Sequence, residues 1–254
     1  MPVVGTLPRA LPRLVATSLS IACDTCAVRD RSICAMLTRD ELLKLNSISQ
    51  FKEFASGQPI LRDGEQQTFF ATVVTGAIKL TKSLSDGRQQ IVGLQFPSDF
   101  LGRPWRLASP YDATAATDVK ICLFSRAKFE DLTKSHPGLG HRLLAHTLDD
   151  LDAAQEWLLL LGRKTASEKV ATLLELMMKR LAPPSPAGAN QLAAFDLPLT
   201  RAEMADCLGL TLETVCRKMT DFKTVGVIEV RDAGRSVQIR DVAKLRRASG
   251  SLEP

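Results

Sequence analysis

Three cysteines lie within twelve positions near the start of the chain, in the segment CDTCAVRDRSIC. Two residues separate Cys23 from Cys26, and seven more precede Cys34. Thiols this close in sequence can converge on one small inorganic group, because sulfur-rich sites bind zinc or iron–sulfur clusters. The segment therefore predicts a metal centre, and it requires a fourth ligand from elsewhere in the fold.

Length and composition narrow the class of protein. The chain has 254 residues, 45% hydrophobic and 24% charged, with a net charge of +5. This allows one large domain or two ordinary ones, and the mild positive charge hints at an anionic partner. No apolar run reaches the roughly 18 to 20 residues of a membrane span. An export signal is not favoured, because Pro12 and Arg13 interrupt the apolar stretch near the N-terminus. Six cysteines in a chain this long indicate metal binding or redox work in a reducing cytoplasm.

The first half of the chain reads as a short helix followed by strands. Residues 38–50 predict a helix, because Thr38 and Glu41 form a capping box. From 51 to 125, short alternating segments are separated by glycines, and Ser85-Asp86-Gly87-Arg88 is a hairpin signal between two of them. These strands predict a small antiparallel sandwich or roll, whose last strand carries Cys122.

Residues 139–162 predict one long helix with a narrow heptad seam. The seam residues are Leu144, Leu148, Leu151 and Leu158. Gln155 takes the position that would complete the seam. Such a seam indicates pairing with a helix of another copy, and the alternative is a helix lying on its own sheet. Three acidic residues beside the seam would oppose like charges across a two-fold axis and weaken the pair: Asp149, Asp150 and Asp152.

The last third of the chain predicts two helices joined by a tight turn. Thr200 caps the first helix, Gly209 ends it, and Thr211 caps the second, which runs to about residue 225. This spacing is typical of a helix-turn-helix. A hairpin around residues 231–235 follows as a wing. A further helix opens at a capping box at 165–168, and the proline-rich stretch 182–192 is predicted to be a linker.

The second of these two helices carries chemistry for DNA. Glu213, Cys216 and Arg217 share one face. Arg can bind guanine O6 and N7 together, and Glu can accept from cytosine N4. The residues expected to contact phosphates are Thr200, Thr211, Lys218, Lys223, Arg231 and Arg235. The alternative is an ordinary solvated helix face.

The fourth metal ligand has three candidates. Cys207 is expected to be buried in the first helix of the DNA-binding unit, and Cys216 to face DNA, which leaves Cys122. Arg29 and Arg31 lie inside the cysteine segment, where cations would stabilise an anionic cluster. Structural zinc and a metal-free thiol switch remain as alternatives.

Several of these pieces, in this order, resemble the Crp/Fnr family of transcription regulators, in particular its oxygen-sensing Fnr branch. They are CDTCAVRDRSIC, VVTGAIKLT, DGRQQIVGLQFPSDFLG and LTRAEMADCLGLTLETVCRKM, and the resemblance covers about residues 20–245. It implies an α+β fold with an antiparallel β-roll similar to a cyclic-nucleotide-binding domain, a long dimerisation helix and a C-terminal winged helix-turn-helix. The expected divisions are a flexible arm at 1–20, the cysteine segment and roll at 21–138, the dimerisation helix at 139–164 and the DNA-binding domain at 165–254.

The resemblance also implies the cofactor and partners. A 4Fe–4S cluster would be held by Cys23, Cys26, Cys34 and Cys122. An intact cluster would favour a cytoplasmic homodimer that binds a palindromic promoter and works with RNA polymerase, and oxygen would switch it off. The implied protein is not an enzyme, although an electron-transfer enzyme is a third alternative.

The family's patterns fit this chain with three departures. Its base-reading pattern Glu-x-x-Ser-Arg falls on Glu213, Cys216 and Arg217, so a TTGA-type half-site is expected with relaxed preference at the cysteine. Ala154 of the long helix stands where the family can carry an acidic residue. The Arg-Ser pair that holds a cyclic nucleotide is replaced by Tyr111-Asp112, so no nucleotide effector is expected. No membrane partner is expected either, because no apolar run is long enough for a span.

Overall fold

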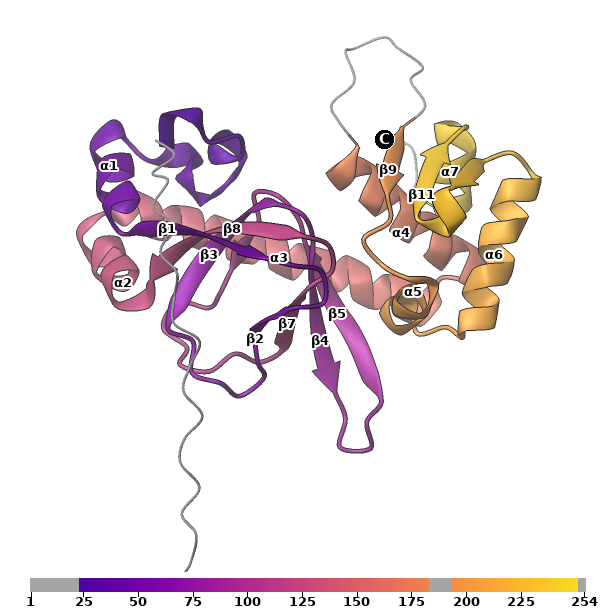
Figure 1. The fold of residues 1–254 in the computed structure, drawn as a ribbon, viewed down its shortest axis with the longest axis horizontal. Coiled ribbons are helices and arrows are strands. Elements are labelled where there is room, and N and C mark those ends of the chain that lie inside the picture. Colours follow the sequence, from indigo (N-terminus) through magenta and orange to yellow (C-terminus); the bar gives the residue numbers. More distant parts are fainter. Residues whose placement is uncertain (1–22, 183–192, 251–254) are drawn as a thin grey trace, which may run out of the picture.

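A computed structural model of the chain describes residues 23–182 and 193–250. Figure 1 shows a β-roll with the N-terminal segment on one side and a helical unit on the other. The long helix α3 (Pro137–Arg163) joins the two parts. The α+β architecture agrees with the expectation from sequence. The predicted arm at 1–20 and the linker at 182–192, apart from Ala182, lie outside the described residues.

The cysteine segment forms three short 3-10 helices before the roll begins. They are η1 (Cys23–Thr25), η2 (Arg29–Arg31) and η3 (Ile33–Met36). Helix α1 (Arg39–Ser47) follows, and it opens at the predicted capping box, where the Thr38 side chain accepts from the backbone N–H of Glu41. Within α1, Leu45 is the buried residue, so this helix adds little to the core.

The roll consists of two four-stranded sheets, whose orders are β1-β8-β3-β6 and β2-β7-β4-β5. The strands of the first are β1 (Ser49–Phe54), β8 (Val119–Ser125), β3 (Phe69–Thr75) and β6 (Phe100–Leu101). Those of the second are β2 (Pro59–Leu61), β7 (Asp112–Ala115), β4 (Ile78–Ser83) and β5 (Gln89–Gln95). The paired strands are antiparallel, and the predicted hairpin at 85–88 joins β4 to β5. The sequence therefore predicted this part of the fold correctly.

Strand β8 divides its side chains between two cores. Val119 and Ile121 pack between the two sheets. Because successive side chains of a strand point to opposite faces, Cys122 and Phe124 lie on the other side. That outer face is covered by η3, by α2 (Arg126–Ser135) and by the first turns of α3, which contribute Ile33 among other buried residues. We call this covered surface the cysteine face.

Helix α3 buries one side and exposes the other. Leu139 and Leu143 pack at the cysteine face, and Leu160 packs in the helical unit. The seam leucines 144, 148, 151 and 158 are between 52% and 72% exposed. The alternative that the seam lies on the chain's own sheet is therefore wrong. At 1.5 Å per residue the helix is about 40 Å long, so it connects the cysteine face to the helical unit.

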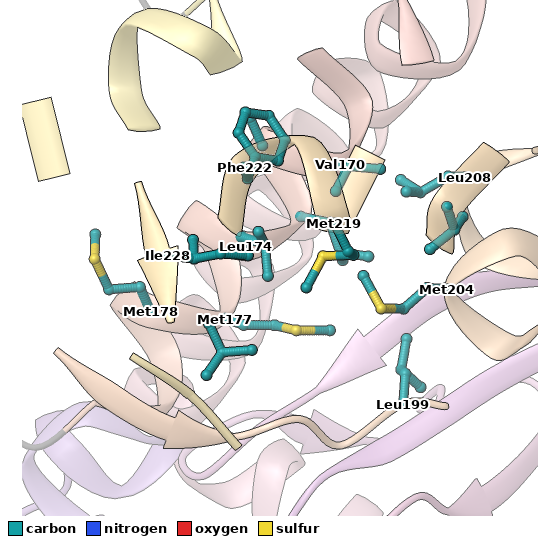
Figure 2. Packing of buried hydrophobic residues seen from close by; sticks show 14 of the residues in the cluster. Val170, Leu174, Met177, Met178, Leu199, Met204, Leu208, Met219, Phe222 and Ile228 are labelled. Carbon is teal, nitrogen blue, oxygen red and sulfur yellow. The ribbon is translucent and has the colours of Figure 1, made fainter. Parts of the chain in front are cut away.

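The helical unit contains the predicted helix-turn-helix and wing. Its helices are α4 (Ala166–Leu181), α5 (Arg201–Leu208), α6 (Leu212–Thr224) and α7 (Val242–Ser249). Its sheet has the order β10-β11-β9, with β9 (Ala194–Asp196), β10 (Ile228–Arg231) and β11 (Ser236–Ile239), and η4 (Asp232–Gly234) in the wing turn. Figure 2 shows Leu174, Met177, Met204 and Met219 among the side chains of one buried cluster, to which α4, α5 and α6 all contribute.

The roll and the helical unit meet at β5 and α5, a contact that sequence patterns did not predict. Ile91 of β5 packs within the core of the helical unit. Lys79 forms an ion pair with Glu203, the capping-box residue of α5. The Gln90 amide donates to the Cys207 carbonyl at 3.0 Å. Apolar and polar contacts together therefore hold α5 against the roll.

Candidate metal centre and nucleic-acid interface

Cys122 occupies the centre of the cysteine face. Its strand β8 lies between β1 and β3, where the residues opposite Cys122 are Phe51 and Thr72. Cys34 lies on η3, which packs against the start of α3, and it joins the same apolar cluster as Cys122. Strand register and the packing of η3 thus bring two cysteines together from positions far apart in the sequence.

The electrostatics of the thiols place all four cysteines close to one another. Burial raises the pKa of the Cys122 thiol to about 12, and Cys34, Cys23 and Cys26 add smaller increases. Burial likewise raises the pKa of Cys34 to about 11, and Cys23 and Cys26 again contribute. Each effect needs the thiols to be near enough to repel as thiolates. Cys34 and Cys122 pack in one cluster, and Cys23 and Cys26 are near enough to act on both.

The surroundings of these thiols suit ligands that carry negative charge. The Ser49 hydroxyl lowers the pKa of the Cys122 thiol, and its proton is donated to the Asn46 carbonyl at 3.0 Å. The charge of Arg29 lowers the pKa of the Cys34 thiol. The Cys23 thiol donates to Asn46 Oδ1 at 3.6 Å. Across the described residues, no three His, Cys, Asp or Glu side chains gather tightly enough for a single metal ion. Four-cysteine clusters spread their ligands over several irons, so the donor set fits such a group.

The two remaining cysteines lie where the sequence placed them. Cys207 has no exposed surface and packs in the core of the helical unit. Cys216 is exposed on α6. Both therefore lie in the helical unit, away from the cysteine face. Arg31, predicted to stabilise a cluster, is exposed.

The helix-turn-helix forms through the predicted local signals. The Thr200 side chain accepts from the backbone N–H of Glu203, Gly209 ends α5 in the left-handed region at φ 60°, and Thr211 caps α6 by accepting from the Thr214 N–H. A left-handed backbone at this position favours glycine. The turn between the helices is therefore specified by the residues within it.

One side of α6 is free to meet a ligand, because the other is buried. Val215, Met219 and Phe222 pack into the helical unit. The predicted base-reading residues Glu213, Cys216 and Arg217 are all exposed. They lie three and four residues apart, so they share the outward face and point toward solvent as an inserted helix requires.

The predicted phosphate contacts are not equally available. Lys223 and Arg235 are exposed. Lys218 instead pairs with Asp221 at 2.8 Å, and Arg231 pairs with Glu229 at 2.8 Å. Thr200 and Thr211 use their hydroxyls in the helix caps. Lys218 and Arg231 would have to exchange these carboxylates for a phosphate.

A polar pocket between β4, β7 and α5 includes Asp112, which the sequence analysis expected at the place of a nucleotide-binding pair. Asp112 lines it with Arg62, Lys79 and Glu203. Asp112 accepts from the backbone N–H of Asp63 at 3.0 Å. Lys79 is committed to Glu203, so Arg62 is the remaining cation of these four residues. The pocket therefore offers carboxylates beside the position where a phosphate would need cations.

Three polar residues near the cysteines could not be found from sequence patterns: Ser49 and Thr72 beside Cys122, and Asn46 at Cys23. Strand alternation could have placed Thr72 on the same face as Phe70, which lies in the apolar cluster of the cysteine face. The register between β3 and β8 was still needed to set Thr72 opposite Cys122. No local signal supplies that register.

Two domain families match separate parts of the chain. The cyclic nucleotide-binding domain matches residues 51–136, and the Crp-like helix-turn-helix domain matches residues 168–248. The whole of α3 lies between the two matches. In the part of the chain that the structure describes, no helix has the length and apolar character to cross a membrane.

Curated relatives match along almost the whole chain. The transcriptional activator protein FnrL of Cereibacter sphaeroides is 47% identical over 90% of this chain and 92% of its own length. A probable transcriptional activator of Rhizobium leguminosarum bv. viciae is 42% identical over 91% and 94%. Among solved structures, FixK2 from Bradyrhizobium japonicum superposes with a TM-score of 0.72 at 32% identity, covering 81% of this chain and all of that chain.

Proposed function

Since the chain belongs to the Crp/Fnr family of DNA-binding transcription regulators, and is not an enzyme, we propose that a 4Fe–4S cluster controls its binding to DNA. When bound, the cluster supplies an oxygen-labile centre whose loss signals the presence of oxygen. The ligands are Cys23, Cys26, Cys34 and Cys122. Activation of transcription together with RNA polymerase, in the cytoplasm, is part of the same proposal.

The observation that carries the proposal is the packing of Cys34 and Cys122, far apart in sequence, against one buried cluster, with Cys23 and Cys26 near enough to raise the pKa of both. Burial alone would keep Cys34 and Cys122 protonated. Ligation requires thiolates, so loading the site must release protons. A sulfur-rich site with nearby hydroxyl donors and one arginine compensates for that cost better than an ordinary core would.

A route from the cysteine face to the dimer seam supports control of association. Residues of η3 pack against α3, and Ile33 joins Leu139 and Leu143 in one buried cluster. Ordering of η3 by its ligand Cys34 would hold the N-terminal half of α3 in place. The exposed seam leucines of the same helix would then pair with those of a second copy.

The DNA-binding unit supports recognition of a TTGA-type half-site. Glu213 and Arg217 stand exposed on the outward face of α6, with Cys216 between them. Two copies related by a two-fold axis would place two such helices in successive major grooves of a palindrome. Replacing Arg217 with Ala should cost about 1 to 3 kcal/mol of binding free energy and relax preference at one base pair, as measured by binding to single-base variants of the site.

We also propose that no cyclic nucleotide acts on this chain. Asp112 and Glu203 line the pocket beside Lys79, which is already paired. Carboxylates at that position would repel a cyclic phosphate.

Metal analysis of protein prepared without oxygen tests the proposal. Iron and sulfide in equal amounts, with a brown absorbance that fades in air, would support it. Colourless protein containing zinc would favour the second candidate, a zinc-dependent or thiol-dependent regulator of the same family. Iron-free protein that binds the palindrome at full strength would overturn the role of the cluster.

A further inference from the structure

A buried hydroxyl stands beside the cysteine face without any hydrogen-bond partner. Thr72 is 3% exposed, and its Oγ1 has no partner in the structure. Buried polar atoms nearly always have a partner, because leaving one unsatisfied costs about 1 to 3 kcal/mol. The Thr72 hydroxyl is therefore available to an acceptor that forms at this site.

Strand register directs Thr72 toward the cysteines. Thr72 of β3 lies directly opposite Cys122 of β8, and Phe70 lies opposite Phe124. Directly opposed residues of an antiparallel pair share a face, with Cβ atoms about 4.5 to 5.5 Å apart. Phe70 and Phe124 belong to the cluster of the cysteine face, so Thr72 points to that face as well.

We propose that Thr72 donates a hydrogen bond to the Cys122 sulfur when that sulfur is a metal-bound thiolate, and so sets the redox properties of the cluster. This inference rests on the proposed function. A thiol accepts only weakly, whereas a thiolate is a strong acceptor, so the bond forms when the proton leaves. On the other neighbouring strand, the Ser49 hydroxyl donates to the Asn46 carbonyl at 3.0 Å, so Thr72 is the hydroxyl of these two without an acceptor.

Hydrogen bonds to ligand sulfurs draw electron density from the metal centre and raise its reduction potential. The expected consequence is a cluster that gives up electrons less readily and survives longer in air. Loss of one such bond should change the ratio of oxidised to reduced cluster about fivefold. Thr72 is thus a positioning and tuning residue, and it does not ligate the metal itself.

The test compares three proteins loaded with iron and sulfide without oxygen: wild type, Thr72→Val and Thr72→Ser. Thr72→Val keeps the shape and removes the hydroxyl, and should give a more negative reduction potential and about fivefold faster loss of cluster absorbance in air. Thr72→Ser keeps the donor and should match the wild type. Thr81→Val is the matched control, because Thr81 is also buried but lies on β4 in the other sheet.

Each outcome decides the proposal. An unchanged reduction potential and cluster lifetime in Thr72→Val would overturn the proposal. If Thr72→Val also lowered the stability of the iron-free protein, a buried water would be identified as the partner of the hydroxyl. Loss of iron from Thr72→Val with retention in Thr72→Ser would support a role of the hydroxyl in holding the cluster. Loss of iron from both variants would overturn it, because the hydroxyl retained in Thr72→Ser would not be enough to hold the cluster. Absence of iron from the wild type would instead contradict the proposed function.

Discussion

The cysteine face of the roll and the core of the DNA-binding unit are both buried, yet their polar groups are used differently. In the DNA-binding unit, the Lys169 ammonium donates to the Leu208 carbonyl at 3.2 Å, and the Ser249 hydroxyl donates to Glu175 at 2.8 Å. At the cysteine face, burial raises the pKa of Cys34 and Cys122. The first arrangement stabilises a fold, whereas under the proposed function the second would prepare thiols for a ligand. Stability and sensing would then be separated along the chain.

The largest expected effect is the loss of iron on replacing the ligand that comes from the roll. Cys122→Ser should reduce the iron content of oxygen-free preparations almost to zero, because a hydroxyl does not replace a thiolate at such a centre. Cys216→Ser is the control, since that cysteine lies exposed on α6. Iron analysis of both variants decides the matter, and full iron in Cys122→Ser would remove Cys122 from the ligand set.

A core variant should affect the DNA-binding unit without affecting iron. Leu174 is fully buried on α4, so Leu174→Ala should lower the free energy of unfolding by about 2 to 5 kcal/mol. Iron content should stay at the wild-type level, because Leu174 does not touch the cysteine face. Thermal unfolding and iron analysis on the same samples would check this. A parallel loss of iron would show that the two regions are not separable.

Two capping boxes of the same type sharpen the comparison, because one lies in each region. Thr165→Ala, at the start of α4, should lower the free energy of unfolding by about 1 kcal/mol, since eight residues of that helix are buried. Thr38→Ala, at the start of α1, should change thermal stability less and instead speed the loss of cluster absorbance. The reason is that α1 buries Leu45 and supplies Asn46, which contacts the Cys23 thiol. Equal effects of both variants on absorbance would contradict this assignment.

The smallest expected effect comes from an ion pair on the dimer helix. The Nδ1 of His146 lies 3.2 Å from an Asp150 oxygen, and this bond raises the pKa of His146 above its ordinary value of 6.5. Asp150, Asp99 and Asp149 are the charges that act on it, and its ring contacts Phe100. Because the folded pKa is raised, the stabilisation is complete below the unfolded pKa and is lost as pH rises through the folded pKa.

The pair is largely exposed at Asp150, so its contribution should be only about 0.3 to 0.5 kcal/mol. His146→Gln should remove this part of the pH dependence of unfolding, and the difference between variant and wild type should shrink toward higher pH. An identical pH dependence in the two proteins would show that the pair contributes nothing.

Local signals explain why the DNA-binding unit was predictable and the cysteine face only partly so. The Thr200 cap, Gly209 and the Thr211 cap each act within a few residues, so sequence alone placed them correctly. The involvement of Cys122 followed from elimination and resemblance, but its neighbours Ser49 and Thr72 depend on the register of three strands. The docking of α5 on β5, and the ion pairs that occupy Lys218 and Arg231, depend likewise on contacts that no short motif encodes.

DNA binding and association state, measured on one oxygen-free sample before and after air, test the central claim most directly. Sedimentation and binding to a TTGA-type palindrome would be followed together with iron content. We predict an iron-loaded dimer that binds the palindrome, and an iron-depleted monomer after air that does not. Protein that stays dimeric and bound after all its iron has gone would contradict the account.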